Sequence, residues 1–189
     1  MSDDEIREII LKGLERAEFE IEPPAQDYIL RVTQGFPQYA HLLAQNAARA
    51  ALDAGGSAIT SEHVIAGMNV AVSYADQSHR DAYFKAATGT KKKNLWAEVV
   101  AACALAESDE RGYFSSRAVQ DRLSEILGRP VIQQTVAFHL GKLTEPSRGT
   151  LLERIGPERR YRYRFINPLM RPFVVMKATA DKLVRNGAS

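Results

Sequence analysis

Residues 160–165 alternate arginine with aromatic side chains in the order RYRYRF. Successive side chains of a β-strand point to opposite faces, so this segment predicts a strand with one apolar face and one cationic face. The segment TLLERI precedes it at 150–155, and the turn GPER at 156–159 joins the two. Together they predict a β-hairpin whose second strand carries a row of arginines.

Helical segments lead up to this hairpin. An apolar helix is expected at 94–108, then a short extended piece, then a helix that starts at Ser115 or Ser116 and ends at Leu127. A turn with Gly128 and Pro130 follows. The next helix runs to residue 143, and its inward side is expected to consist of Ile132, Val136, Leu140 and Leu143, which fall within one narrow arc. This order of elements, with a last helix after the hairpin, is that of a winged helix-turn-helix domain.

The first half of the chain predicts helices only. Helical patterns cover about 3–17, 24–34 and 37–54, and a further pattern starts at Thr60 or Ser61 and continues to about 87. Gly35 is expected to end one helix and Pro37 to start the next. The fold class is therefore mostly α, with a helical bundle followed by a winged helix-turn-helix domain that has a β-hairpin wing.

The charge of the chain changes sharply along its length. Residues 1–89 hold 7 basic against 13 acidic residues, whereas residues 90–189 hold 18 against 10. The net charges of −6 and +8 indicate two domains with different partners. The change falls in TGTKKKN at 88–94, which predicts a linker. We therefore expect a helical domain at 1–89 and a winged-helix domain at 90–189.

Composition limits the possible functions. No apolar run is long enough to span a bilayer, and the acidic start of the chain does not match a secretory signal. Cys103 is the single cysteine, which excludes an internal disulfide and a cysteine zinc site. The four histidines show no metal-ligand spacing with carboxylates, and no catalytic constellation is visible. We expect a cytoplasmic, non-enzymatic protein with no bound metal.

Two segments carry a family resemblance. GFPQYAHLLAQNAARAALDAGGSAITSEHVIAGM, at 35–68, resembles the last helices of the small helical lid of AAA+ ATPases. TVAFHLGKL and GTLLER resemble the third helix and first wing strand of winged-helix proteins. In this order they are similar to the C-terminal half of initiator-type AAA+ ATPases, as in archaeal origin-recognition proteins and bacterial STAND-like ATPases. The resemblance covers nearly the whole chain.

The resemblance implies a regulatory part of a larger ATPase. ATP and Mg²⁺ would belong to the full-length protein, because this sequence has no G-x-x-x-x-G-K-[ST] phosphate loop and should not hydrolyse ATP by itself. Related lids carry a nucleotide-sensing arginine at the position of Gln38, which has no charge to offer a γ-phosphate. Pro37, which forms with Gly35 a motif like the G-x-P of STAND-type ATPases, would face the adenine. The alternative is that Gly35 and Pro37 only end one helix and start another.

The third helix of the winged-helix domain offers an uncharged face for binding. With the apolar arc inward, the residues expected outward are Gln134, Ala137, Phe138, Gly141 and Lys142. Gln134 would pair with adenine, and Lys142 would reach a phosphate or guanine. Phe138 fits a protein partner as well as it fits DNA. The helix alone therefore predicts little discrimination between base sequences.

The wing supplies positive charge. If the aromatic side chains pack inward, Arg160, Arg162 and Arg164 project outward together and can bind successive phosphates. The same surface is expected to include Arg159 at the tip, Arg154 on the partner strand and Arg148 before it. The alternative is a solvated face whose arginines pair with Glu153, Glu158 or the acidic first half.

Three hypotheses remain open from the sequence. The chain is a lid plus a DNA-binding winged helix of an AAA+ ATPase, which binds duplex DNA weakly and with little sequence preference. In the second hypothesis the same architecture docks a protein partner or its own ATPase domain, autoinhibiting it in one version. In the third it is a free-standing transcription regulator. The arginine wing favours the first, Phe138 favours the second, and the missing phosphate loop favours the third.

Overall fold

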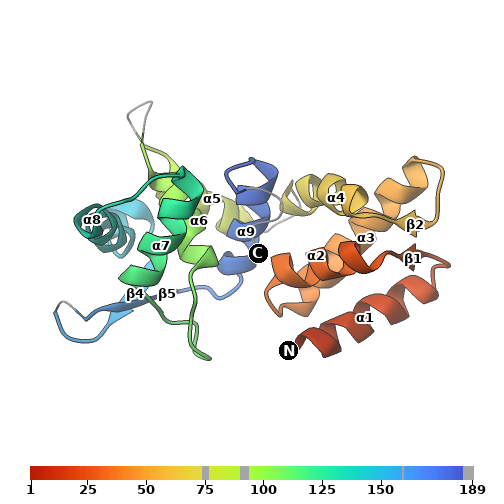
Figure 1. Cartoon of the computed structure of the whole chain (residues 1–189), viewed down its shortest axis with the longest axis horizontal. Helices are drawn as coiled ribbons and strands as arrows, with labels where there is room; N and C mark the ends of the chain where they lie inside the picture. The colour runs from red at the N-terminus through yellow and green to blue at the C-terminus, as the bar shows by residue number, and fades with distance from the viewer. Residues whose placement is uncertain (74–76, 90–93, 159, 185–189) are drawn as a thin grey trace. The chain divides into compact units, whose positions relative to one another are not determined.

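A computed structural model describes residues 1–73, 77–89, 94–158 and 160–184. The chain divides into two compact units, Met1–Ala75 and Asp76–Ser189. The fold is mostly α, with a helical bundle in the first unit and a winged helix-turn-helix with a β-hairpin wing in the second, as the sequence predicts (Figure 1). Residues 90–93 of the linker predicted at 88–94 lie outside the described residues.

Helices of the first unit begin and end close to where the sequence places them. They are α1 (Asp3–Glu15), α2 (Pro23–Thr33), α3 (Pro37–Asp53) and α4 (Ser61–Ser73). Ser2 and Glu5 form a reciprocal capping box at the start of α1. The helical pattern expected up to about residue 87 is described as α4, to Ser73, and α5 (Gln77–Ala87), and residues 74–76 lie outside the described residues.

The first unit also contains a short sheet that the sequence does not predict. β1 (Glu20–Ile21) pairs in parallel with β2 (Ala58–Ile59). Strands of two residues are too short to show a period, so no pattern could indicate them. The pair joins the segment after α1 to the segment before α4.

Gly67 brings α3 and α4 together. A Cβ atom at Gly67 would lie 2.7 Å from the backbone nitrogen of Ala47 and 2.8 Å from the carbonyl carbon of Asn46. Only a residue without a side chain permits this approach of the two helices. Around this contact, the core of the unit includes Leu43, Val64 and Met68, all fully buried.

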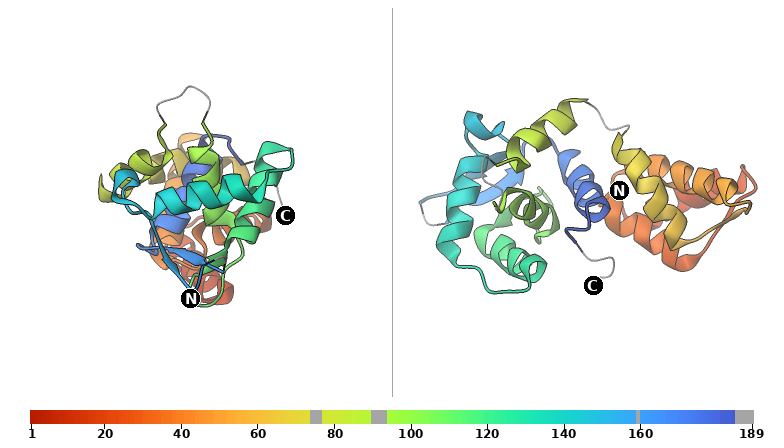
Figure 2. Two further views of the ribbon diagram at one scale, coloured as in Figure 1. Left: turned by 90° about the vertical axis from the view of Figure 1, so that its left-hand side faces the viewer. Right: turned by 90° about the horizontal axis from the view of Figure 1, so that it is seen from above.

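The second unit has the winged-helix order of elements. After α5 come α6 (Trp96–Leu105), β3 (Phe114–Ser115), α7 (Ser116–Leu127), α8 (Gln133–Leu143), the 3₁₀ turn η1 (Pro146–Arg148), β4 (Leu152–Ile155), β5 (Arg162–Phe165) and α9 (Met170–Ala180). Among the described residues the sheet is antiparallel in the order β3-β5-β4. α8 and the β4–β5 hairpin lie at the same end of this unit (Figures 1 and 2).

The structural boundary between the units lies one helix earlier than the 89/90 boundary expected from charge. α5 packs on α6 and α9, and it belongs to the winged-helix unit. Its His79 accepts a hydrogen bond at Nε2 from the side-chain amide of Asn167, with 2.7 Å between the nitrogens, and its ring stacks on Phe173. The packing of α5 therefore places it in the second unit. The change of net charge along the sequence could not show this, because charged residues lie mostly on the surface and not in the packed core.

Arg171 ties α9 to the end of α6. Its guanidinium donates to the backbone oxygens of Ala104 and Ala106, at 2.8 and 2.7 Å, and to the hydroxyl of Ser108. Burial lowers the pKa of Arg171. These bonds satisfy carbonyl groups that the end of a helix leaves without partners. In the part of the chain that the structure describes, no helix has the length and apolar character needed to cross a membrane.

Candidate nucleic-acid interface

α8 occupies the position of the recognition helix. Val136, Leu140 and Leu143 are fully buried against the rest of the unit. Gln134, Ala137 and Phe138 are exposed, as the sequence predicts. Ile132 is 67% exposed, contrary to the expectation that it packs inward, because it is the N-cap residue, with an extended backbone outside the helical register.

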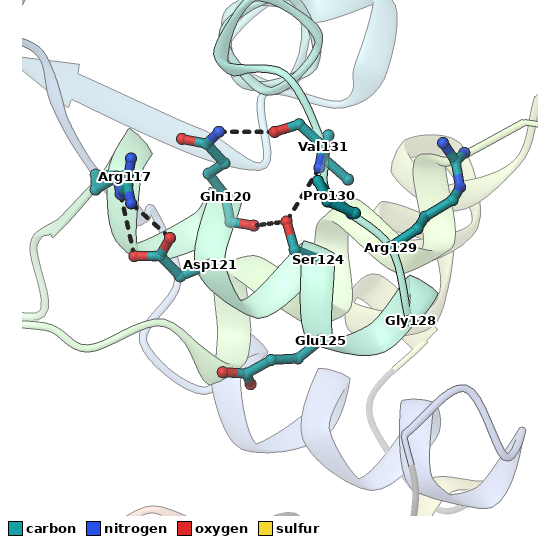
Figure 3. A pocket seen from close by; sticks show the side chains of 9 residues that line it. All are labelled: Arg117, Gln120, Asp121, Ser124, Glu125, Gly128, Arg129, Pro130 and Val131. Carbon is teal, nitrogen blue, oxygen red and sulfur yellow. Dashed lines mark hydrogen bonds and ion pairs between the residues drawn. The ribbon is translucent and has the colours of Figure 1, made fainter.

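A hydrogen-bonded clamp sets the position of α8 relative to α7. The side-chain amide of Gln120 donates to the backbone oxygen of Val131 at 2.6 Å, and the N–H of Val131 donates to the hydroxyl of Ser124 at 3.2 Å (Figure 3). Gly128 ends α7 in the left-handed region with φ 64°. The intervening Arg129 is exposed. Gly128 marks this turn in the sequence, whereas Arg129, a cation beside the start of α8, was not predicted as a site residue.

The hairpin has the two faces that its alternating sequence predicts. Tyr163 and Phe165 on β5 are buried, whereas Arg162 is exposed and Arg164 is half-buried. Cross-strand partners share a face of a sheet, and Glu153 is opposite Arg164. The face of the hairpin that carries Arg162 and Arg164 therefore also carries the carboxylate of Glu153, which comes from β4.

Both arginines of β5 are paired within the unit. Arg162 Nη1 lies 3.0 Å from Asp109 Oδ2, and Arg162 Nη2 donates to the backbone oxygen of Tyr113 at 2.9 Å. Arg164 forms an ion pair with Glu153, and this hydrogen bond raises the pKa of Arg164. Backbone N–H groups of Tyr113 and Arg111 donate to Asp109 and hold the pKa of its carboxyl below the usual value. Glu153 was foreseen as a partner, but Asp109 was not.

The remaining wing arginines do not extend this row. Arg154 is opposite Tyr163, so it lies on the other face of the hairpin, with its Cζ atom 4.7 Å from the ring centroid of Tyr161. Arg160 is exposed and lies in the turn before β5, where its backbone N–H donates to the backbone oxygen of Pro157. Neither arginine forms an ion pair with another described residue. Arg159 lies outside the described residues.

Arg148 connects η1 to the end of α5 and to Trp96. Its guanidinium donates to the backbone oxygen of Thr88 at 2.5 Å and to that of Ala86 at 3.5 Å, at the end of α5. Its Cζ atom also lies 3.8 Å from the ring centroid of Trp96. An arginine that caps a helix and stacks on an indole has fewer donors left for a phosphate than the sequence suggested.

An open groove lies between the end of α5 and α8. We call it the α5–α8 groove, and its volume is about 690 Å³. Lys85 and Thr88 line it from the end of α5, and Trp96 lines it from the start of α6. Phe138 and Lys142 line it from α8, and Arg148 lines it from η1. Lys142 Nζ donates a hydrogen bond to Glu145 Oε2 at 3.0 Å, and this bond holds the pKa of Glu145 below its usual value.

In the first unit, Gly35, Pro37 and Gln38 form the junction between α2 and α3. Gln34 and Gly35 both have positive φ, 54° and 79°, which turns the chain, and Pro37 is the first residue of α3. Gln38 is exposed in the first turn of α3. The three residues therefore lie together at one helix start, far in sequence from the winged-helix surface.

Comparisons with known proteins give a distant likeness. No protein-family model and no curated protein matches the chain. Among solved structures, the chain is similar to Cdc6p from Pyrobaculum aerophilum, with 15% sequence identity and a TM-score of 0.31. The match covers 97% of this chain and 49% of that one, so the chain spans about half the length of that protein.

Proposed function

We propose that the second unit binds duplex DNA weakly and with little sequence preference. The observation that supports this most is the exposed face of α8, with Gln134 and Phe138 outward, at the same end of the unit as the hairpin (Figure 1). A winged helix that binds DNA lays this helix in the major groove and its wing along the backbone. The exposed cations Arg129, Arg154 and Arg160 then meet phosphates on either side.

Affinity in this proposal comes from phosphate contacts and not from base contacts. Gln134 is suited to the edge of an adenine, but the other outward side chains of α8 read bases poorly. Arg154 and Arg160 form no ion pair with another described residue, so they bind phosphate without first breaking one. Arg162 and Arg164 must first exchange a carboxylate for a phosphate. Their contribution is correspondingly smaller.

We further propose that the chain is the non-catalytic C-terminal part of an AAA+ ATPase. In that case the junction of Gly35, Pro37 and Gln38 faces the nucleotide of the full-length protein, with Gln38 offering a neutral amide where related lids offer an arginine. The support is the order of a helical bundle and a winged helix in one chain. Fusing the chain to its upstream coding sequence and measuring ATP hydrolysis tests this part of the proposal.

Fluorescence anisotropy of a labelled duplex with the full chain tests the DNA proposal. Binding is expected at about 50 mM salt, should fall steeply by about 200 mM salt, and should be equal for duplexes of unrelated sequence. The absence of binding at the lower salt concentration overturns the proposal. A strong preference for one sequence contradicts the role given to phosphate contacts.

A protein partner is the second candidate. The observation that favours it is Phe138, which is 56% exposed at the edge of the open α5–α8 groove. Duplex DNA presents charged phosphates on its outside and no protruding apolar group that would cover Phe138.

A further inference from the structure

The α5–α8 groove has an apolar floor that is held in place. Trp96 is 9% exposed, with the Arg148 guanidinium at 3.8 Å and the ring of His139 at 4.4 Å between centroids. Phe138 lies beside it, with 6.4 Å between the ring centroids, and is exposed toward solvent. A rigid floor with one open aromatic face suits the insertion of one apolar side chain, because little conformational entropy is lost on binding.

The rim of the groove is cationic. Lys85 is exposed and forms no ion pair with another described residue. Lys142, on the opposite wall, forms an ion pair with Glu145. A single carboxylate placed between the two lysines would be attracted by both. The rim therefore favours a ligand with one or a few negative charges.

A nucleic-acid strand fits these features less well. Binding of a strand needs a track of free cations for successive phosphates and aromatic faces for successive bases. In this groove Arg148 Nη1 donates to the backbone oxygens of Thr88 and Ala86, and the Arg148 guanidinium covers a face of Trp96. Glu145 repels any anion at the rim, so a strand with several phosphates is disfavoured more than a ligand with a single carboxylate. One open ring and one free lysine match a carboxylate next to an apolar side chain.

We propose that the α5–α8 groove binds an acidic segment of a partner protein, with one leucine-like side chain on Phe138 and a carboxylate between Lys85 and Lys142. The contact is small, so the association is weak and reversible. Lys85 lines the groove but is not part of the proposed DNA contact, so it marks the peptide interaction alone. Phe138 and Lys142 belong to both surfaces, so a bound peptide and a bound duplex compete for α8.

The single tryptophan of the chain, Trp96, provides a direct readout. The probe is a short peptide with a central leucine flanked by aspartates and without aromatic residues, added to the full chain in the absence of DNA. Saturable change of Trp96 emission is expected, with a dissociation constant of about 10 µM to 1 mM. Replacing the leucine by serine, or the aspartates by asparagine, should each weaken binding about fivefold or more.

Matched variants separate the groove from general surface effects. Phe138→Ser and Lys85→Glu should each weaken peptide binding about fivefold or more. Ile166→Ser and Lys182→Glu remove a similarly exposed apolar residue and lysine elsewhere in the unit, and they should change it less than about twofold. A folded Phe138→Ser protein that binds as well as the parent overturns the proposal.

Two other outcomes also overturn it. One is the absence of any saturable Trp96 response. The other is a single-stranded oligothymidine that gives a stronger response with the same dependence on Phe138 and Lys85, which makes the occupant a nucleic acid. The duplex assay contains no peptide and this assay contains no DNA, so failure of either proposal is distinguishable from failure of the other.

Discussion

Arg162 and Asp109 form an ion pair, with 3.0 Å between Nη1 and Oδ2, that joins the middle strand of the sheet to the loop before β3. The pair removes one arginine from the cationic face of the wing. Asp109→Asn should therefore strengthen duplex binding by roughly threefold at low salt, because it frees Arg162 and removes a negative charge. The side-chain oxygen of the introduced asparagine can still accept the N–H groups of the loop, so the loop is expected to remain folded.

Asp181→Asn is the control for this prediction. It makes the same change of charge in the same unit, next to Lys177 and not next to the wing. Equal strengthening in both variants would show that total charge, and not the release of Arg162, controls affinity.

The pH dependence of Asp109 follows from its hydrogen bonds. Because its pKa is lowered in the folded state, its contribution to stability is present above the unfolded pKa of about 3.9 and is lost as pH falls through the lower folded pKa. An NMR titration of the Asp109 side-chain carbon should give a midpoint below about 3.9. A midpoint at or above this value contradicts the hydrogen bonding described for the loop.

The contacts of Arg148 with the end of α5 and with Trp96 predict that this residue stabilises the second unit. Arg148→Ala removes the cap on α5 and the cation–π contact, so it should lower the free energy of unfolding of the second unit by about 1–2 kcal/mol. Trp96 fluorescence during urea unfolding measures this unit specifically. Arg148→Lys keeps the charge but not the planar group and should recover only part of the loss. Full recovery by lysine would show that the charge alone matters.

Gly67→Ala is predicted to destabilise the first unit. The added Cβ meets the backbone of α3 at 2.7 Å, so the helices must move apart at a cost of about 1–3 kcal/mol. Gly13→Ala is the matched control, since its Cβ has no atom within 4 Å and it lies within α1. That change should stabilise the unit by about 0.5–1 kcal/mol. Urea unfolding followed by circular dichroism compares the two, and destabilisation of equal size in both variants contradicts the packing argument.

The sequence predicted the elements well where a period or a turn residue marked them. Tyr163 and Phe165 face inward as their alternation indicates, and Gly128 ends α7 as expected. Ile132 was placed wrongly because a helical arc was extended one residue before the helix starts. A hydrophobic residue that immediately precedes a helix obeys backbone geometry and not the helical period.

The partners of the candidate site were harder to predict, because they come from distant parts of the chain. Asp109 reaches Arg162 only once β3 pairs with β5, and Arg148 reaches Thr88 only once η1 packs on α5. The alternating pattern assigned Arg162 to a face but could not reveal which carboxylate would share that face. Arg154 was grouped with the wrong face because the cross-strand register was not known from the sequence.

The most direct test of the proposed DNA contact compares two pairs of arginines in the salt dependence of duplex binding. For the full chain, Arg154→Ala with Arg160→Ala should reduce the slope of log affinity against log salt by about 1.8, since each free arginine releases about 0.9 counterion. Arg162→Ala with Arg164→Ala should reduce it by less than about 0.9, because these side chains are held by Asp109 and Glu153. Equal slopes for the parent and the Arg154/Arg160 variant, or a larger effect of the Arg162/Arg164 variant, would contradict the account.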